Sequence, residues 1–267
     1  MPEPYRICVL FNGYETERWA KDAIEQLLSD QSITSCFSVI NTDAGFSGTS
    51  ARIRARKYPA WALYRVGRTM LPPKSGHWNR PVEVEDIDGL TDDFVECEPA
   101  DRNGLWHDLP ANVIKRIEDE ADLVFRNGFD LLRGDVLEAA ADGVLSYHHG
   151  DPRRYRGGPA GFWELLEGAS TSGAMVQRLS PDLDSGEILA YRDVDLEGTG
   201  TWIDVKQRLY GESTDLLEAA VTRIRSEDGP VLQPEEIGPV YTPPNARELL
   251  RYLWMESRGL WNSYRSI

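Results

Sequence analysis

The sequence predicts an α/β protein with an open, mostly parallel, twisted sheet flanked by helices. Short apolar runs rich in β-forming residues alternate with helical patterns along most of the 267-residue chain. The chain opens with such a run over residues 5–11, a helical pattern over 16–28 and a second run over 34–40. A strand, a helix and a strand in this order require a parallel pair joined by a right-handed crossover. Alternation of the two element types is typical of the α/β class.

Helices are expected where apolar residues recur every three or four positions. They cover residues 16–28, 51–70, 110–120, 135–141, 161–166 and 202–225. We expect one helix over residues 51–70 in spite of Pro59, ended by Leu71-Pro72-Pro73, because proline cannot continue a helix. Pro110 begins the next helix, at a position where its missing N–H costs nothing.

Strands are expected where β-branched and aromatic residues cluster between turn residues. They cover residues 5–11, 34–40, 81–86, 91–97, 121–126, 143–147, 174–179 and 188–194. Two of them end in polar residues, because Asn127-Gly128 follows one and His148-His149-Gly150 follows the next. Ligands of open parallel sheets bind beyond the carboxyl ends of the strands, and consecutive strands are usually neighbours. These two strand ends are therefore the expected site.

The C-terminal part of the chain differs in composition. Residues 229–244 carry five prolines, which excludes a helix and predicts a linker or an extended arm. A terminal helix over residues 245–262 follows, with Asn245 as its N-cap. Its large apolar residues are expected on one face: Leu249, Leu250, Leu253 and Trp254. We accordingly divide the chain into an α/β domain, residues 1–228, and an arm with a terminal helix, residues 229–267.

The charge balance limits the partners. Lys and Arg number 29 against 44 Asp and Glu, a net charge of −15, so the average surface repels a nucleic-acid backbone and no nucleic-acid partner is expected. An acidic, lysine-poor chain favours a halophilic source, because strong screening reduces self-repulsion; an ordinary acidic protein is the alternative. No run of about 18 apolar residues is present, so no membrane span is expected. The terminal helix, with Trp254 and Trp261, is expected to pack on the domain or on a second subunit in a homodimer.

The cysteines indicate a reducing compartment. Cys8, Cys36 and Cys97 are odd in number and widely spaced. We expect free thiols, with neither a disulfide framework nor a metal site. The N-terminus lacks the basic segment and cleavage site of a signal peptide, so a cytoplasmic location is expected.

Two of the four histidines, His148 and His149, directly follow a predicted strand. A histidine at such a strand end can act as a general acid or base, or donate to a developing oxyanion. The surrounding segment, residues 143–157, has the sequence GVLSYHHGDPRRYRG. Further on, Ser172-Gly173 precedes one predicted strand and Leu183-Asp184-Ser185-Gly186 precedes another.

In order and spacing these motifs resemble the formyltransferase family. That family includes methionyl-tRNA formyltransferase, glycinamide ribonucleotide transformylase and the sugar N-formyltransferases. Its pattern is Asn-x-His, a Ser-Leu-Leu-Pro loop and Tyr-Arg-Gly, then Thr-Gly before a strand and Leu-Asp-Thr-Gly before another. The resemblance covers about residues 121–191 and implies the formyltransferase fold.

The resemblance implies transfer of a formyl group from 10-formyltetrahydrofolate, or a related formyl pterin, to an amine. His148 matches the family histidine, which donates to the negatively charged oxygen that forms. Asp184 matches the aspartate, which sets the state of the histidine and helps to move protons. A carboxylate beside an imidazole also fixes its tautomer, whatever the family. The alternative for Asp184 is an ordinary turn residue, since Asp-Ser-Gly is common in turns.

Ser146 stands where the family has asparagine. A hydroxyl is shorter than a carboxamide and donates one hydrogen, and losing an oxyanion donor costs roughly 10²–10³ in rate. Three explanations stay open. Asn127 or His149 supplies the missing donor, the enzyme hydrolyses the formyl pterin with water, or catalysis is lost and binding is kept. The catalytic candidates are thus Ser146, His148 and Asp184, and a serine-nucleophile triad is not expected, because Ser146 lacks a nucleophile elbow.

The resemblance also assigns binding residues. The expected cofactor contacts are Asn127, Gly128, Phe129, Thr171 and Gly186, with core packing as the alternative for Phe129. Arg153 and Arg156 with His149 are expected to bind an anionic acceptor such as a nucleotide sugar, with a solvated, ion-paired loop as the alternative.

The expected substrate is therefore a small-molecule amine, with an amino sugar favoured. The Gly-rich phosphate loop of the ribonucleotide transformylases is replaced by residues 12–17, NGYETE, whose carboxylates repel a phosphate. The C-terminal part leaves no room for the barrel that helps methionyl-tRNA formyltransferase to hold tRNA. A formyl-folate hydrolase and a non-catalytic folate- or nucleotide-binding protein are the alternatives.

Overall fold

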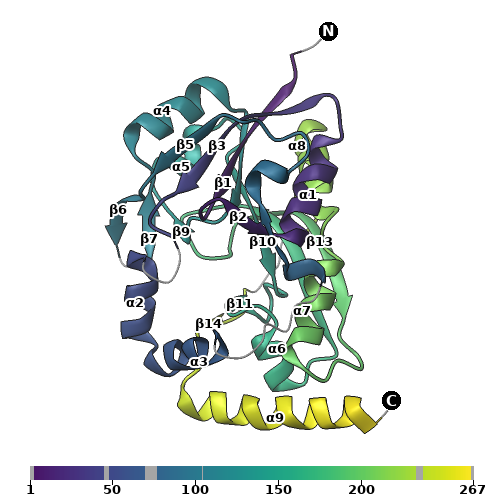
Figure 1. The fold of residues 1–267 in the computed structure, drawn as a ribbon. Coiled ribbons are helices and arrows are strands. Elements are labelled where there is room, and N and C mark those ends of the chain that lie inside the picture. The colour runs from purple at the N-terminus through teal and green to yellow at the C-terminus, as the bar shows by residue number, and fades with distance from the viewer. Residues whose placement is uncertain (1–2, 45–47, 70–76, 104, 233–236, 266–267) are drawn as a thin grey trace.

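A seven-stranded sheet forms the centre of the computed structural model, which describes residues 3–44, 48–69, 77–103, 105–232 and 237–265 (Figure 1). The strand order is β13-β12-β10-β8-β1-β3-β5. The strands are β1 (Tyr5–Phe11), β3 (Ile33–Asn41), β5 (Phe94–Cys97), β8 (Leu123–Asn127), β10 (Val144–His149), β12 (Thr171–Arg178) and β13 (Glu187–Asp195). Within this sheet β12 runs antiparallel to both of its neighbours and the other pairs are parallel, so the predicted fold class is confirmed.

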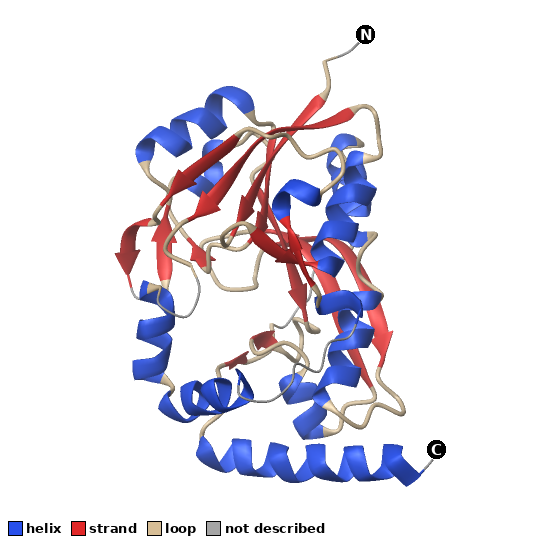
Figure 2. Cartoon of the chain, viewed as in Figure 1, coloured by secondary structure: helices blue, strands red, loops and turns tan. Residues whose placement is uncertain are grey.

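Helices cover both faces of the sheet (Figure 2). On one face α1 (Arg18–Leu28), α6 (Phe162–Glu167), α7 (Trp202–Gly211) and α8 (Leu216–Arg225) enclose a core that includes Val9 and Phe125. On the other face α4 (Ala111–Glu120) and α5 (Val136–Ala139) pack on Leu10 and Val124. Neighbouring residues of β1 and β8 thus enter different cores, as the two-residue period of a strand requires.

Two predicted helices are each divided in the structure. Residues 51–70 are not one helix: α2 (Thr49–Lys57) and α3 (Pro59–Thr69) are separated at Tyr58, with φ −129° and ψ 68°, and Met70 lies outside the described residues. The cause is Pro59, since a residue before proline is sterically pushed out of the helical region. The pattern over residues 202–225 likewise forms α7 and α8, with Glu212 as the C-cap of α7.

Several short strand pairings were not predicted from the sequence. Residues 81–86 divide into β4 (Pro81–Glu83), paired with β2 (Glu15–Glu17), and a 3₁₀ turn, η2 (Val84–Asp86). A small sheet joins β6 (Ala100–Asn103), β7 (Trp106–Asp108) and β9 (Leu131–Leu132). Strands of two to four residues are too short to show a period in the sequence.

The Pro-rich segment is an extended arm that pairs with the loop after β10 in a separate two-stranded sheet. Its strand β14 (Val240–Tyr241) pairs with β11 (Arg156–Gly157), and α9 (Ala246–Arg265) then crosses the molecule as the yellow helix in Figure 1. Asn245 caps α9, because its side-chain oxygen accepts from the N–H groups of Arg247 and Glu248 at 2.9 and 3.1 Å. The chain division at residue 228 stays a prediction.

The buried face of α9 differs from the predicted one. Leu249 and Tyr252 are buried, and Tyr252 lies against Phe162, Trp202 and Tyr64. Leu250, Leu253, Trp254 and Trp261 are exposed. Among the described residues no helix has the length and apolar character needed to span a membrane. Cys8, Cys36 and Cys97 are free thiols, as expected.

Candidate active site

The two faces of β10 carry different side chains at its carboxyl end. Ser146 and His148 are two residues apart and share one face, while Tyr147 and His149 share the other. Tyr147 and His149 lie among aromatic residues of the α1 side, with their rings stacked 5.5 Å apart. Ser146 and His148 instead contact polar groups from β8 and the turn after β12. The face with Ser146 and His148 is called the site face below.

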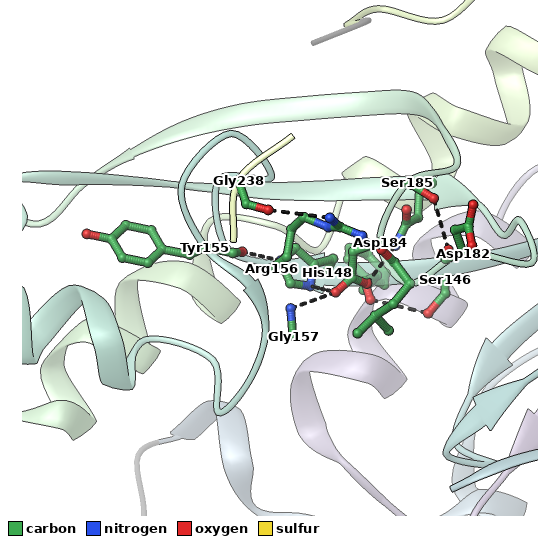
Figure 3. A network of polar contacts seen from close by, with 12 residues as sticks. Ser146, His148, Tyr155, Arg156, Gly157, Asp182, Asp184, Ser185 and Gly238 are labelled. Atoms are coloured by element: carbon green, nitrogen blue, oxygen red, sulfur yellow. Dashed lines mark hydrogen bonds and ion pairs between the residues drawn. The ribbon is translucent and has the colours of Figure 1, made fainter. Parts of the chain in front are cut away.

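His148 has protein acceptors at both ring nitrogens (Figure 3). Its Nε2 lies 2.8 Å from the carbonyl oxygen of Tyr155, and its Nδ1 lies 3.5 Å from Oδ2 of Asp184. A carbonyl can only accept a hydrogen bond, so Nε2 carries a proton and donates it. The ring is 8% exposed. In this arrangement Nε2 is already used, and Nδ1 faces the carboxylate.

Asp184 is held by a tight turn between β12 and β13. Its Oδ2 accepts from the N–H of Gly157 at 2.8 Å, and its Oδ1 accepts from Nε2 of Gln177 at 3.1 Å. The backbone at Asp184 is left-handed, with φ 46°. At Gly186 an added Cβ would lie 1.8 Å from the Arg178 carbonyl oxygen, so the turn closes only with glycine there. This turn therefore aims a carboxylate at His148.

The arm fastens this turn from the other side. Arg156 donates to the carbonyl oxygens of Leu183 and Gly238, and so ties the turn to the arm (Figure 3). At Gly157, with φ 79°, a Cβ would lie 2.3 Å from the carbonyl oxygen of Tyr241. Only glycine allows β11 and β14 to approach so closely.

Arg126 is a functional candidate that sequence analysis missed. It faces Ser146 in the register of β8 and β10, and its Nη1 donates to Oγ of Ser146 at 2.7 Å. Its Nη2 donates to the backbone oxygen of Asp130. Burial lowers the pKa of Arg126, while the carboxylates of Asp184 and Asp130 act in the opposite direction. The sequence signal that could have identified it is an arginine between the apolar run ADLVF and the turn Asn127-Gly128.

Neither residue expected to replace the family asparagine lies on the site face. Asn127 donates from Nδ2 to Oγ1 of Thr16 in β2, at 2.7 Å. Nε2 of His149 lies 2.9 Å from Oγ of Ser213, with the ring of Tyr210 at 3.9 Å. Both point away from Ser146 because they are an odd number of positions from the site-facing residues of their strands. This part of the prediction is corrected.

His149 is enclosed by protein. Its ring lies against Trp19, Tyr147 and Tyr210 and is 6% exposed. Burial, with a small contribution from His148, lowers the pKa of His149 to about 3. A neutral, enclosed ring gives an anionic acceptor neither a charge nor a free face, so the expected substrate contact is corrected.

The other expected substrate contacts also have protein partners. Nε and Nη2 of Arg153 bind the Asp151 carboxylate at 2.8 and 2.9 Å, and Nη2 reaches the Tyr191 hydroxyl at 2.9 Å. Arg156 holds the Asp184 turn, as described above. The ion-paired loop, which was the alternative, accounts for Arg153 in this structure.

The expected cofactor contacts lie in three places. A Cβ on Gly128 would lie 2.6 Å from the Asn12 nitrogen, and the N–H of Phe129 donates to Oδ1 of Asn12 at 2.8 Å. The Phe129 side chain is fully buried in the α4-side core, which was the alternative interpretation. Thr171 is exposed at the start of β12, and Gly186 closes the Asp184 turn. None of these placements tests pterin binding.

A cavity of about 360 Å³ opens beside the strand ends, between β1, β3 and the helices α2 and α3. Its lining includes Asn12, Asp43, Arg54, Trp61, Arg65 and Asp130. Arg54 forms an ion pair with Asp130. Burial acts to raise the pKa of Asp130, but Arg54, Ser50 and His107 together outweigh it and hold that pKa below its usual value.

The charge around this cavity departs from the rest of the chain. Residues 44–82, which include α2 and α3, contain eight Lys and Arg and no Asp or Glu, in a protein of net charge −15. Sequence analysis drew its conclusion from the charge of the whole chain and assigned no function to this stretch. A local count along the sequence would have found it.

A sequence model of the formyl transferase family matches residues 106–221. This segment is similar in sequence to the formyl transferase family. It contains Arg126, Ser146, His148 and Asp184, whereas α2, α3 and the arm lie outside it. The recognised motifs thus fall in the matched segment.

Similar curated proteins agree with this family. The chain is 29% identical over 122 residues to a methionyl-tRNA formyltransferase of Borrelia duttonii, covering 46% of this chain and 39% of that protein. It is 28% identical over 153 residues to the Rickettsia africae protein of that name, covering 57% and 50%. The chain therefore spans half or less of the length of these relatives.

Solved structures share the formyl transferase fold. A glycinamide ribonucleotide transformylase of Symbiobacterium toebii superposes with a TM-score of 0.57 at 17% identity, over 90% of this chain and 96% of that one. A sugar N-formyltransferase of a Shewanella species gives 0.57 at 12%, over 94% and 87%. An N-formyltransferase of Helicobacter canadensis, solved with folinic acid and dTDP-3-aminofucose, gives 0.55 at 12%, over 91% and 72%.

Proposed function

We propose that this protein transfers a formyl group from 10-formyltetrahydrofolate to the amine of a small molecule. The observation that carries the proposal is the His148–Asp184 pair at the carboxyl end of β10, inside the formyl transferase segment. Such a pair can accept a proton and stabilise the charge that results.

The donor supplies a formyl carbon bonded to nitrogen, the amine forms the new C–N bond, and the old C–N bond breaks. The attacking amine loses one proton and the departing nitrogen gains one. Because Nε2 of His148 donates to Tyr155, Nδ1 is the ring atom that can take up and return this proton. The Asp184 carboxylate, 3.5 Å away, stabilises the ring while it is protonated.

The side chains that line the cavity beside β1 and β3 match the groups of a reduced folate. Trp61 offers an aromatic surface, the carboxylate of Asp130 can accept from ring amino groups, and Arg54 can pair with a carboxylate tail. Asp130 also joins the cavity to the site face, because its backbone oxygen accepts from Arg126. Asn127, Gly128 and Phe129 lie directly before it in the chain and stay candidate cofactor contacts, as do Thr171 and Gly186.

An amino sugar is the acceptor we favour. The structural neighbour from Helicobacter canadensis was solved with a dTDP-linked amino sugar. The basic stretch of residues 44–82 would attract the phosphates of such a compound. The absence of a nucleic-acid partner, a homodimer, a cytoplasmic location and a halophilic source stay predictions.

Ser146 favours a second candidate, hydrolysis of the formyl folate by water. The family asparagine is missing there, and His148 could activate water as it would an amine. The amine dependence of the reaction separates the two functions.

The test measures 10-formyltetrahydrofolate consumption with and without a panel of amines that includes dTDP-linked amino sugars. Formate and formylated amine are quantified in parallel for the wild type and His148→Asn. Formylated amine from the wild type alone supports transfer, and formate released without an amine supports the hydrolase. Donor binding by calorimetry without turnover in either reaction would contradict both and leave a binding protein.

A further inference from the structure

Arg126 is a partly buried cation that the proton-transfer steps above do not use. Its Nη1 is fixed by Ser146 and its Nη2 by the Asp130 carbonyl. Its Nε is buried without a hydrogen-bond partner among the described residues. A charge withdrawn from water is costly unless it is paired, and both acceptors of this guanidinium are neutral, so its placement calls for an explanation.

Apart from Arg126, the donors of the site face are already used by protein acceptors, and Nε2 of Gln177, the register partner of Ser146 on β12, donates to Asp184. Nε2 of His148 already donates to Tyr155, and its Nδ1 faces Asp184. The hydroxyl of Ser146 donates its one hydrogen to the Tyr147 carbonyl at 3.2 Å and accepts from Arg126. Ser146 therefore cannot act as the family asparagine does.

We propose that Arg126 is the catalytic residue that donates to the formyl oxygen, and that Ser146 is the positioning residue that holds its guanidinium. This inference rests on the proposed formyl transfer. As the amine nitrogen bonds to the formyl carbon, one electron pair of the C=O bond moves to the oxygen. It returns when the old C–N bond breaks, and Arg126 stabilises the charge by hydrogen bonding without transferring a proton.

The geometry favours this role over a structural one. Arg126 and Ser146 are register partners on adjacent parallel strands, and His148 is two residues further along the same face. Each terminal nitrogen of a guanidinium has two hydrogens, so each has one left after its hydrogen bond to Ser146 or Asp130. The guanidinium is planar, so the directions of its N–H groups are fixed. In a site with a low dielectric constant these donors stabilise a developing negative charge effectively. The Ser146 side chain is shorter than that of asparagine, so it leaves room for the guanidinium.

The first measurement is the carbonyl stretch of bound 5-formyltetrahydrofolate, labelled with ¹³C at the formyl carbon, by isotope-edited infrared spectroscopy. We expect the stretch to shift upward in Arg126→Met relative to the wild type, because a hydrogen bond to the oxygen is lost. Arg126→Lys, which keeps the charge without the fork, should give an intermediate position. Arg116→Met, on the distant helix α4, is the matched control and should leave the stretch unchanged.

The second measurement is kcat for formyl transfer. Arg126→Met should lower kcat by roughly 10²–10³-fold, and Ser146→Ala by about tenfold, with the dissociation constant of 5-formyltetrahydrofolate changed less than about threefold. Arg126→Ala combined with Ser146→Asn places the family asparagine at position 146 and should recover at least about tenfold over Arg126→Ala alone.

The outcomes separate the two proposals. A wild type that transfers formyl groups, with kcat and the carbonyl stretch unchanged in folded Arg126→Met and Arg126→Lys, overturns the role of Arg126 and leaves the function intact. A wild type that binds the ligand without turnover overturns the function, and the stretch still tests Arg126. A wild type that does not bind overturns both. Melting temperatures show which variants are folded. If Arg126→Met does not fold, Arg126→Lys and Ser146→Ala provide the test.

Discussion

His148 and His149 are consecutive residues of one strand, yet they lie in two different chemical environments. His148 lies against the Asp184 carboxylate and the Tyr155 carbonyl, and its contacts are polar. His149 faces Trp19 and Tyr210, and the contacts around it are aromatic and closed. One position along a strand therefore changes a histidine from a candidate catalytic group to a packing group.

The difference shows that one face of β10 anchors the strand and the other carries the candidate catalytic residues. On the aromatic side, Tyr147 also fastens the strand to α8, since its hydroxyl donates to the Ser213 carbonyl at 2.9 Å and accepts from the N–H of Leu217 at 3.0 Å. These contacts hold β10 while the site face keeps donors and a carboxylate for a ligand. Mutations on the two faces should accordingly affect different measurements.

Asp184→Asn should give the largest effect, and it should appear in the rate. The amide cannot stabilise a protonated His148, so kcat should fall by about 10³-fold, about 4 kcal/mol of transition-state stabilisation. The melting temperature should change little, because an amide oxygen can still accept from the N–H of Gly157. A kcat within threefold of the wild type would show that the pair has no part in proton transfer.

His149→Asn should have its main effect on stability. The change removes most of a buried ring from between Trp19 and Tyr210 and leaves a cavity. We expect a loss of about 3 kcal/mol in the free energy of unfolding, measured by urea denaturation, and less than a tenfold change in kcat at 15 °C. The reverse pattern, a stable protein with little activity, would place His149 in the active site.

The pH dependence of stability should single out His149. Its pKa is about 3 in the folded protein, against about 6.5 when exposed. Between these values the unfolded state binds more protons, so stability is complete above pH 6.5 and falls as the pH is lowered toward 3. At pH 5 the loss attributable to His149 should be about 2 kcal/mol.

The comparison with His149→Phe isolates this contribution, since phenylalanine keeps the ring and does not titrate. Unfolding free energies at pH 8 and pH 5 should differ by about 2 kcal/mol less in His149→Phe than in the wild type. His77→Gln, at an exposed position, is the control and should behave as the wild type does. Equal pH dependence in His149→Phe and the wild type would refute the burial of a neutral ring.

The sequence allowed the fold class and the motif residues to be predicted, because both depend on local patterns. The alternation of strands and helices identified the sheet, and Ser146, His148 and Asp184 were assigned from the resemblance of their motifs to those of the formyltransferase family. The pairing of His148 with Asp184 remained an expectation, since it depends on how the turn after β12 folds back. Arg126 was missed because its significance appears only in the register of β8 with β10. The division of α2 from α3 was missed although Pro59 signalled it.

Loss of the contacts between the arm and β11 should give the smallest of these effects, and it should affect only the site face. In Gly157→Ala the new methyl would meet the Tyr241 carbonyl at 2.3 Å, at a backbone φ of 79° that alanine resists. The β11–β14 pair should open, and Asp184 would lose the fixed position of its donor at residue 157. We expect kcat to fall by about tenfold, about 1.4 kcal/mol, since small misplacements of a catalytic group are costly. Faster proteolysis within residues 229–244 should accompany the loss, and Gly168→Ala, at a glycine with open space around it, controls for strain alone. A tenfold loss without faster cleavage would mean that the turn carries the effect, and that the arm does not support the site face.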